Sequence, residues 1–189
     1  MFEKQAWMQR AGEYPQTDPE YFALLARAVF SAGLGPKVVE SRWADMGVAF
    51  HGFDPAQVTQ MGEDDVARLL SDPAVIRNRR KIEAVIKNAG TFLEQVEERK
   101  AAAGAAGVAA RPAKARGNKG GGAGSDGHAA FHEYLLDLGA GADLDLAADG
   151  LAQVFSHLGR TSAMFFLFSA GWRPRESAGI EALAAVANG

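Results

Sequence analysis

The segment from Phe155 to Ala163 holds residue types that together could bind a phosphate group. It reads Phe-Ser-His-Leu-Gly-Arg-Thr-Ser-Ala, with one glycine between two apolar stretches. Gly159 lets the backbone approach a ligand closely or take a positive φ. If a helix begins there, the N–H groups of Arg160, Thr161 and Ser162 are free donors at its N-terminus, which attracts anions. The segment therefore predicts a phosphate-binding hairpin between two helices.

An ordinary connection between two helices explains the same segment. In that interpretation Thr161 or Ser162 caps the second helix with its side chain, and the glycine only closes the turn. His157 lies in the same turn, where a histidine is commonly a hydrogen-bonding structural residue, and it is also a candidate DNA contact. Both interpretations need a helix on each side, and the leucine-rich stretch before the turn and the apolar residues 164–170 after it predict them.

Helix signals recur along the chain before the hairpin. Thr17-Asp18-Pro19-Glu20 is a helix start, with a cap residue followed by a proline and an acid in the first turn. Further helices are expected from about Pro36 to Gly47, after Asp54-Pro55, from Gly62, and from about Ala74 to Lys100. Patterns of alternating polarity, which are typical of strands, are few. The predicted fold class is all-α.

The composition changes sharply over residues 101–130, where alanine, glycine, lysine and arginine dominate and there is almost nothing to bury. Such a stretch is typical of a flexible basic linker or insertion. Apolar residues at helical spacing resume at Phe131. We therefore expect a single domain over residues 1–189, in which residues 101–130 form a disordered insertion rich in Gly, Ala and Lys.

Composition also limits the chemistry and the compartment. The chain has 189 residues, no cysteine and a formal net charge of −3. Without cysteine there is no disulfide, no thiol catalysis and no cysteine-ligated zinc site. No apolar run approaches the roughly 20 residues of a membrane span, and the first residues lack the pattern of a signal peptide. We expect a cytoplasmic monomer that uses no metal or other cofactor and does not contact a membrane.

Basic residues gather in two places although the chain is acidic overall. Arg77, Arg79, Arg80 and Lys81 form one cluster, and the other lies within residues 111–119. A local basic face can bind DNA on an acidic protein, with weak non-specific affinity and strong salt dependence. A charged helix face is also typical of simple solvation. Both interpretations of the first cluster stay open.

Several motifs resemble, in order and spacing, those of the type I 3-methyladenine DNA glycosylases, within the helix-hairpin-helix glycosylase superfamily. The similarity is densest from Ala32 to Glu94, and it resumes at the hairpin. The insertion has no counterpart in that family. The segments that carry the resemblance are Ala32-Gly33-Leu34, Phe50-His51-Gly52-Phe53-Asp54-Pro55, Met61 with Glu63-Asp64-Asp65-Val66, Ile76-Arg77-Asn78-Arg79-Arg80-Lys81-Ile82, and Leu158-Gly159 with Thr161, Phe165 and Gly171.

The resemblance implies a base-excision repair enzyme for double-stranded DNA, associated with the nucleoid when bound. Such an enzyme hydrolyses the N-glycosidic bond of an alkylated purine, such as 3-methyladenine, after flipping the base out of the stack. An aromatic pocket suits a cationic methylated base. The candidates for that pocket are Trp7, Tyr14, Phe30 and Trp43, and these rings have a core interpretation as well. The candidate DNA-binding residues are His157, Gly159, Arg160, Thr161, Ser162, Arg79, Arg80 and Lys81.

The chain departs from that family at its metal site and in its pocket. The family binds zinc through cysteines and histidines, whereas this chain has no cysteine and carries Met8 at the position of one histidine ligand. The family's base-reading glutamate falls on Ala28, its pocket tryptophan on Pro36 and its pocket tyrosine on Trp7. The hairpin is therefore retained in the sequence, while the base-recognition set is only half present.

The resemblance identifies no catalytic residue. The wider superfamily places a catalytic aspartate beyond the hairpin, but no aspartate follows Asp149 here, and Glu176 is the nearest acid in that direction. The type I family manages without that aspartate. The sequence leaves three functions open: an active glycosylase for alkylated purines, a catalytically inactive relative that recognises damaged or bent DNA, and a helical protein-interaction module that has lost DNA binding.

Overall fold

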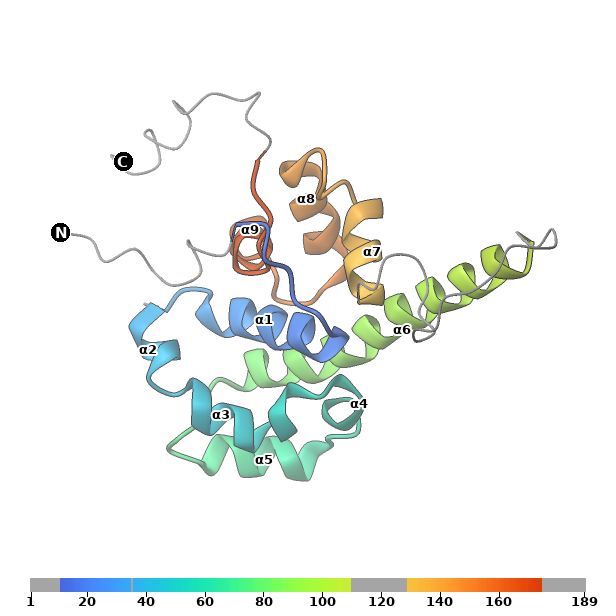
Figure 1. Cartoon of the computed structure of the whole chain (residues 1–189). Helices are drawn as coiled ribbons and strands as arrows, with labels where there is room; N and C mark the ends of the chain where they lie inside the picture. The colour runs from blue at the N-terminus through green and yellow to red at the C-terminus, as the bar shows by residue number, and fades with distance from the viewer. Residues whose placement is uncertain (1–10, 35, 110–128, 175–189) are drawn as a thin grey trace, which may run out of the picture.

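The computed structural model describes residues 11–34, 36–109 and 129–174 (Figure 1). These residues form helices and turns with no strand, which confirms the predicted all-α class. The predicted pocket residue Trp7 and the acid Glu176 lie outside the described residues. The helices are α1 (Asp18–Ser31), α2 (Pro36–Glu40), α3 (Trp43–Ala49), the 3-10 helix η2 (His51–Phe53), α4 (Pro55–Val58), α5 (Glu63–Ser71), α6 (Arg79–Ala109), α7 (Ala130–Asp137), α8 (Leu144–Val154) and α9 (Arg160–Ser169).

Helices α1 and α6 lie at the centre of the described structure. Figure 1 shows α3, α4 and α5 on one side of this pair and α7, α8 and α9 on the other. The packing agrees, because α1 contacts α9 and η2, while α6 contacts α4, α5 and α7. The far end of α6 extends beyond the other helices (Figure 1). The same two central helices therefore hold both outer groups.

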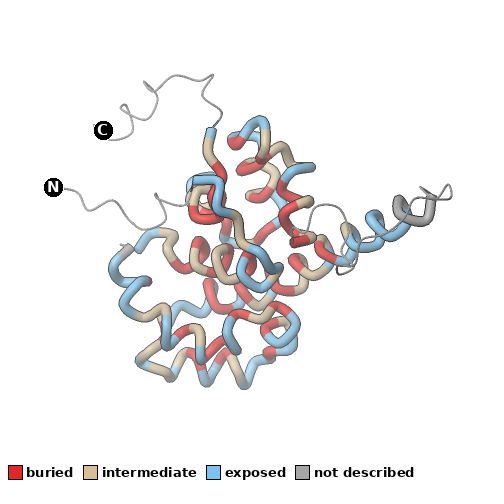
Figure 2. Tube along the Cα trace, in the orientation of Figure 1, coloured by how far each residue is buried: buried red, intermediate tan, exposed pale blue. Residues whose placement is uncertain are grey.

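Buried residues gather where these helices meet (Figure 2), and many of the largest buried side chains are aromatic. Phe131 of α7 stacks on Phe92 of α6 with ring centroids 4.2 Å apart, and Phe92 lies edge-on to Phe22 of α1 at 5.3 Å. Phe131 also meets Phe166 of α9 at 6.3 Å. Burial of large rings gives a strong hydrophobic contribution to stability. This cluster ties the hairpin helix α9 to the two central helices.

Side-chain caps set the starts of several helices where the sequence predicted them. The Thr17 hydroxyl accepts the Glu20 N–H at 3.4 Å, and the Glu20 carboxylate accepts the Thr17 N–H at 3.1 Å, which makes a capping box at α1. Asp54 accepts the Ala56 N–H at 2.9 Å and starts α4. Asp143 caps α8 in the same way, at a start that the sequence did not predict. Local residue types are therefore enough to fix these starts.

Helix α6 begins later than predicted. Its first residue is Arg79 and not Ala74, because the Asn78 side chain accepts the Lys81 N–H at 3.3 Å. Upstream, the Asp72 carboxylate accepts the Ala74 N–H at 2.8 Å and closes a turn. The Asp72 side chain therefore belongs to this turn, and Asn78 stands at the start of the helix.

Two other predicted bounds differ. Helix α6 continues through the alanine-rich residues 101–109, so this part of the predicted insertion is helical and not disordered. Alanine is the strongest helix former, which accounts for the extension. Residues 110–128 lie outside the described residues. The single helix predicted over residues 36–47 is divided into α2 and α3. No described helix is both long and apolar enough to cross a membrane.

Candidate nucleic-acid interface

The predicted hairpin is present, with α8 and α9 joined by residues 155–159 (Figure 1). Gly159 is the N-cap of α9, with φ −67° and ψ 164°, an extended conformation open to any residue. The turn residue with a positive φ is His157, at 57°. A positive φ at Gly159 was therefore a wrong expectation. A Cβ built at Gly159 meets no heavy atom within 4 Å, so the space beside the Gly159 backbone is open to a ligand.

The first turn of α9 offers backbone donors to a ligand. The Ala163 N–H donates to the Gly159 carbonyl at 2.9 Å. The N–H groups of Arg160, Thr161 and Ser162 come before it and have no acceptor within the helix, as at every helix start. Gly159 supplies no side-chain cap, so the interpretation with Thr161 or Ser162 as the N-cap is wrong. These three donors, beside the positive end of the helix dipole, can hold an anion.

The charge beside these donors already has partners. The Arg160 guanidinium lies 2.7 Å from the Asp145 carboxylate and 3.4 Å from the Asp149 carboxylate, both on α8. The hydrogen bond to Asp145 and the charge of Asp149 raise the pKa of Arg160 above its ordinary value. The pairs are well exposed, so solvent screens them and they exchange readily. A phosphate at the hairpin must therefore compete with two carboxylates for Arg160.

A buried asparagine fixes the hairpin turn to α6. Asn88 is fully buried, its Oδ1 accepts the Ser156 N–H at 2.7 Å, and its Nδ2 donates to the Ser156 carbonyl at 2.9 Å. Sequence reasoning missed this residue, because an asparagine on a long charged helix is expected in solvent. The available signal is its position three residues after Val85 and directly before Ala89. Both are apolar residues of α6, and both are buried.

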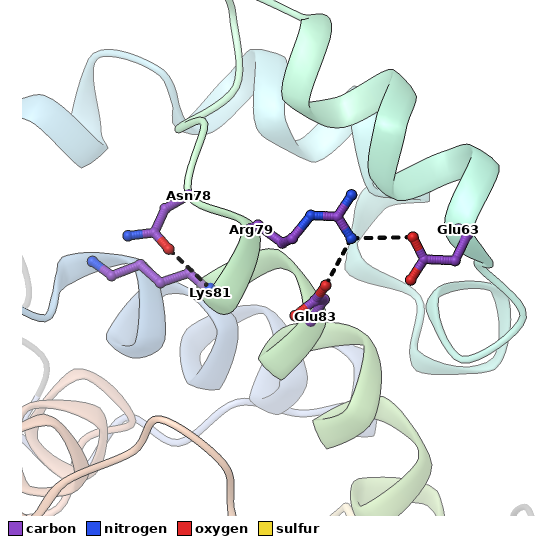
Figure 3. A network of polar contacts seen from close by, with 5 residues as sticks. All are labelled: Glu63, Asn78, Arg79, Lys81 and Glu83. Atoms are coloured by element: carbon purple, nitrogen blue, oxygen red, sulfur yellow. Dashed lines mark hydrogen bonds and ion pairs between the residues drawn. The ribbon is translucent and has the colours of Figure 1, made fainter.

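The basic cluster is divided between surface and core (Figure 3). The Arg79 guanidinium lies 2.9 Å from the Glu83 carboxylate and 3.1 Å from the Glu63 carboxylate. These hydrogen bonds, that of Glu83 first, raise the pKa of Arg79. Arg80 is exposed. The two arginines are therefore on the surface, as predicted, but Arg79 is held by two acids.

Lys81 lies in a different place from the predicted DNA-facing surface. It is only 7% exposed, and its ammonium donates to the Phe30 carbonyl at 2.7 Å and to the Ala32 carbonyl at 2.5 Å. The last carbonyls of a helix have no partner within it, so Lys81 caps the C-terminus of α1. Burial lowers the pKa of Lys81. The lysine therefore joins α6 to α1 in this structure.

Tyr14, a predicted pocket residue, belongs to an aromatic group at the N-terminal end of the described residues. Its ring contacts Trp172 at 4.7 Å and His132 at 4.8 Å between centroids. His132 in turn lies 5.0 Å from Trp172, nearly parallel to it. A cavity of about 480 Å³ opens beside Tyr14, between residues 13–16, α1 and the end of α9. Tyr14 is therefore the described pocket candidate that borders this cavity.

The other two described pocket candidates lie in a second group of rings. Phe30 is fully buried and meets Phe50 at 5.7 Å. Trp43 stacks on Phe53 at 4.5 Å and 10°, and the Arg27 guanidinium lies over the Trp43 ring at 5.6 Å. The Phe50 and Phe53 rings stack with centroids 5.4 Å apart and so connect Phe30 to Trp43. In this structure Phe30 is a core residue, and Trp43 is already covered by other side chains.

Ionisable side chains lie near the Tyr14 rings, since Glu13 and Glu20 border the cavity and His132 stacks on Trp172. Ala28, at the position of the family's base-reading glutamate, is 1% exposed on α1. Within residues 11–34, 36–109 and 129–174, no three His, Asp or Glu side chains are grouped so that they would hold a metal ion. Among the described residues, the candidate site for a phosphate is the hairpin, with the N–H donors of α9, the Arg160 side chain and the Asn88 side chain that holds the turn.

Comparisons with known proteins bear on the family and the fold of this chain. The family model for methyladenine glycosylase matches residues 4–106. DNA-3-methyladenine glycosylase 1 of Escherichia coli (strain K12) is 38% identical over 81 residues, which are 42% of this chain and 43% of that protein. DNA-3-methyladenine glycosylase of Haemophilus influenzae (strain ATCC 51907 / DSM 11121 / KW20 / Rd) is 40% identical over 45 residues, 24% of each chain. The matches therefore span less than half the length of these two relatives.

The fold extends the similarity over most of the chain. A crystal structure of 3-methyladenine DNA glycosylase I has a TM-score of 0.62 at 24% identity and covers 86% of this chain and 83% of its own. A structure of that enzyme from Staphylococcus aureus, solved for its recognition of 3-methyladenine, has a TM-score of 0.62 at 22% identity, with coverages of 87% and 82%. The fold is shared, and the family model matches more than half of the sequence. The chain therefore belongs to the methyladenine glycosylase family.

Proposed function

We propose that this protein is a DNA glycosylase that binds duplex DNA through the α8–α9 hairpin and releases alkylated purines such as 3-methyladenine. The observation that carries the proposal is the open first turn of α9, where three backbone donors and Arg160 surround a glycine with empty space in front of it. Family membership supports it, as do the names of the two curated relatives.

Release of an alkylated purine requires little acid catalysis from the protein. The target bond is inaccessible inside the base stack, so the nucleotide must be flipped out before reaction. A 3-methylated adenine is cationic in DNA, and it departs as a neutral base when the bond from its nitrogen to C1′ breaks. Water adds its oxygen to C1′ and loses a proton to solvent. Because the leaving group is already activated, the protein need supply less acid catalysis, and Ala28 bears on recognition of the base rather than on its departure.

The test of this proposal is release of the base. Methylated duplex DNA is incubated with the full chain, and free 3-methyladenine and abasic sites are both measured. The proposal expects the two products in equal amounts, in proportion to enzyme concentration. Release at the rate of DNA without protein would contradict it.

A second candidate is a catalytically inactive relative that recognises damaged or bent DNA. The observation in its favour is Ala28, since the family's base-reading carboxylate is replaced by a buried methyl group. This candidate predicts salt-dependent duplex binding without base release.

We further propose a cytoplasmic monomer that associates with the nucleoid through DNA. Size-exclusion chromatography tests the oligomeric state, and fractionation of cells tests the location.

A further inference from the structure

The Asn88 side chain makes a complete pair of hydrogen bonds with one residue of the hairpin turn. Its oxygen accepts from the Ser156 N–H at 2.7 Å and its nitrogen donates to the Ser156 carbonyl at 2.9 Å, with Asn88 itself fully buried. Among short side chains, only an amide both donates and accepts in this way. The clamp joins the middle of α6 to a turn 68 residues later in the chain.

The clamp acts on the part of the hairpin that sets the direction of the phosphate donors. His157, directly after Ser156, has a φ of 57°, which is unfavourable for a residue with a side chain. Phe155 and Leu158 on either side are 3% and 1% exposed. The turn is thus held by two apolar anchors and one polar clamp, and α9 begins immediately after it at Arg160.

The clamp does more than packing requires. A buried amide is stabilising only when its hydrogen bonds are made, and an apolar side chain would fill the same space without that condition. Leucine or valine at position 88 would leave the Ser156 N–H and carbonyl without partners and would not fix the register of the turn. The hydrogen bonds therefore specify one conformation of the turn.

We propose that Asn88 is a positioning residue for DNA binding, which holds the turn so that the N–H groups of Arg160, Thr161 and Ser162 face one phosphate. This inference rests on the proposed DNA-binding function of the hairpin. Asn88 acts through Ser156 and does not touch DNA. Loss of the clamp lets His157 leave its left-handed conformation and turns the donors away from a common point.

The experiment compares three variants with the natural chain. Asn88→Ala removes both hydrogen bonds, and Asn88→Leu removes them while filling the space of the side chain. Val85→Ala is the matched control, because Val85 is buried on the same face of α6 and its truncation lowers stability without removing a bond to the turn. Each protein is titrated with a fluorescent duplex carrying an abasic-site analogue, at several salt concentrations. Amide hydrogen exchange of residues 155–162 is followed in the free protein.

Positioning by Asn88 predicts that Asn88→Ala binds the duplex about 10-fold more weakly, equivalent to about 1.4 kcal/mol. It also predicts that the salt dependence falls by about one phosphate contact and that the turn amides exchange faster. Asn88→Leu weakens binding as Asn88→Ala does, and it serves as the test if Asn88→Ala does not fold. Val85→Ala keeps the affinity and the salt slope of the natural chain.

Two contrary results have different meanings. If the natural chain binds the duplex and Asn88→Ala matches Val85→Ala in affinity and salt slope, Asn88 has only a structural role and the inference is overturned. If the natural chain does not bind the duplex, the proposed function fails. Turn amides that exchange equally in Asn88→Ala and the natural chain also overturn the inference, with no reference to DNA.

Discussion

The guanidinium Nη2 of Arg160, the first residue of α9, lies 2.7 Å from the carboxylate Oδ1 of Asp145 on α8, across the hairpin. The cation nearest the proposed phosphate site is therefore neutralised before DNA arrives. A phosphate must displace Asp145, or share Arg160 with it, at an additional electrostatic cost. The acidic partner thus sets part of the affinity of the hairpin for DNA.

Asp145→Asn should tighten duplex binding, because it removes the shorter of the two ion pairs of Arg160 and a negative charge beside the phosphate. We expect a gain of about two- to threefold at low salt that disappears at high salt. Fluorescence anisotropy at two salt concentrations measures it. Glu97→Gln is the control, since it makes the same change of charge on α6 and breaks a comparable exposed pair with Lys100. Equal gains in both variants would mean that only the net charge matters.

Replacement of Gly159 should separate folding from DNA binding. Aspartate fits there, since a Cβ meets no atom within 4 Å and the backbone is already that of an N-cap. Its carboxylate would accept hydrogen bonds from the first turn of α9, so we expect Gly159→Asp to raise stability by roughly 0.3 kcal/mol. The same bonds occupy the phosphate donors, and the added charge repels DNA. Duplex affinity should therefore fall at least about 10-fold.

Gly159→Asn distinguishes the two causes of that loss. Asparagine caps a helix about as well as aspartate but carries no charge. We expect it to weaken binding less than Gly159→Asp, with equal thermal stability. Unchanged duplex affinity in both variants would show that the first turn of α9 does not face DNA.

Removal of the buried ammonium at Lys81 should lower stability. Lys81→Met leaves the carbonyls of Phe30 and Ala32 without their donor, and we expect a loss of about 1–3 kcal/mol in urea unfolding. Lys87→Met makes the same substitution at an exposed position of α6, where a change within about 0.5 kcal/mol is expected. Equal effects of the two substitutions would contradict the assigned role of Lys81.

The cap at Asp54 predicts a stability that depends on pH. The hydrogen bond from the Gln57 side chain, with the Ala56 N–H, lowers the pKa of Asp54. A lowered pKa in the folded state means that the contribution is fully present above the ordinary carboxyl pKa. It is lost as the pH falls through the lower, folded value. Asp54→Ala should cost about 1 kcal/mol at pH 7, and this difference should shrink in acid.

Asp54→Asn is the control, because asparagine also caps a helix and does not titrate in acid. Urea unfolding of the three proteins between neutral and acidic pH provides the measurement. If Asp54→Ala stays less stable than the natural chain by the same amount throughout acid, the carboxylate is not the source of the cap.

The parts of the fold that the sequence predicts are those with local causes. The caps at Thr17 and Asp54 depend on residues within three positions along the chain, and both starts are confirmed. The all-α class depends on helical spacing and is confirmed as well. The bounds predicted for α6 are wrong at both ends, because the helix starts at Arg79, directly after Asn78, and because alanines extend it beyond Lys100.

The polar contacts of the candidate site could not be predicted, because their partners are distant in sequence. Lys81 reads as one of four basic residues, yet its acceptors lie 51 and 49 residues earlier. Asn88 reads as a surface amide, yet its partner lies 68 residues later. The pairing of Arg160 with α8 likewise requires the closed hairpin. The single domain over residues 1–189 and the role of Glu176 stay predictions.

Base release by the natural chain and by Gly159→Asp tests whether a glycosylase reaction depends on the first turn of α9. Both proteins are incubated with the same methylated duplex DNA, and free 3-methyladenine and new abasic sites are measured over time. Our account predicts release by the natural chain and at least about 10-fold slower release by Gly159→Asp at limiting enzyme concentration, with no loss of thermal stability. No release by the natural chain, or equal release by both proteins, would contradict it.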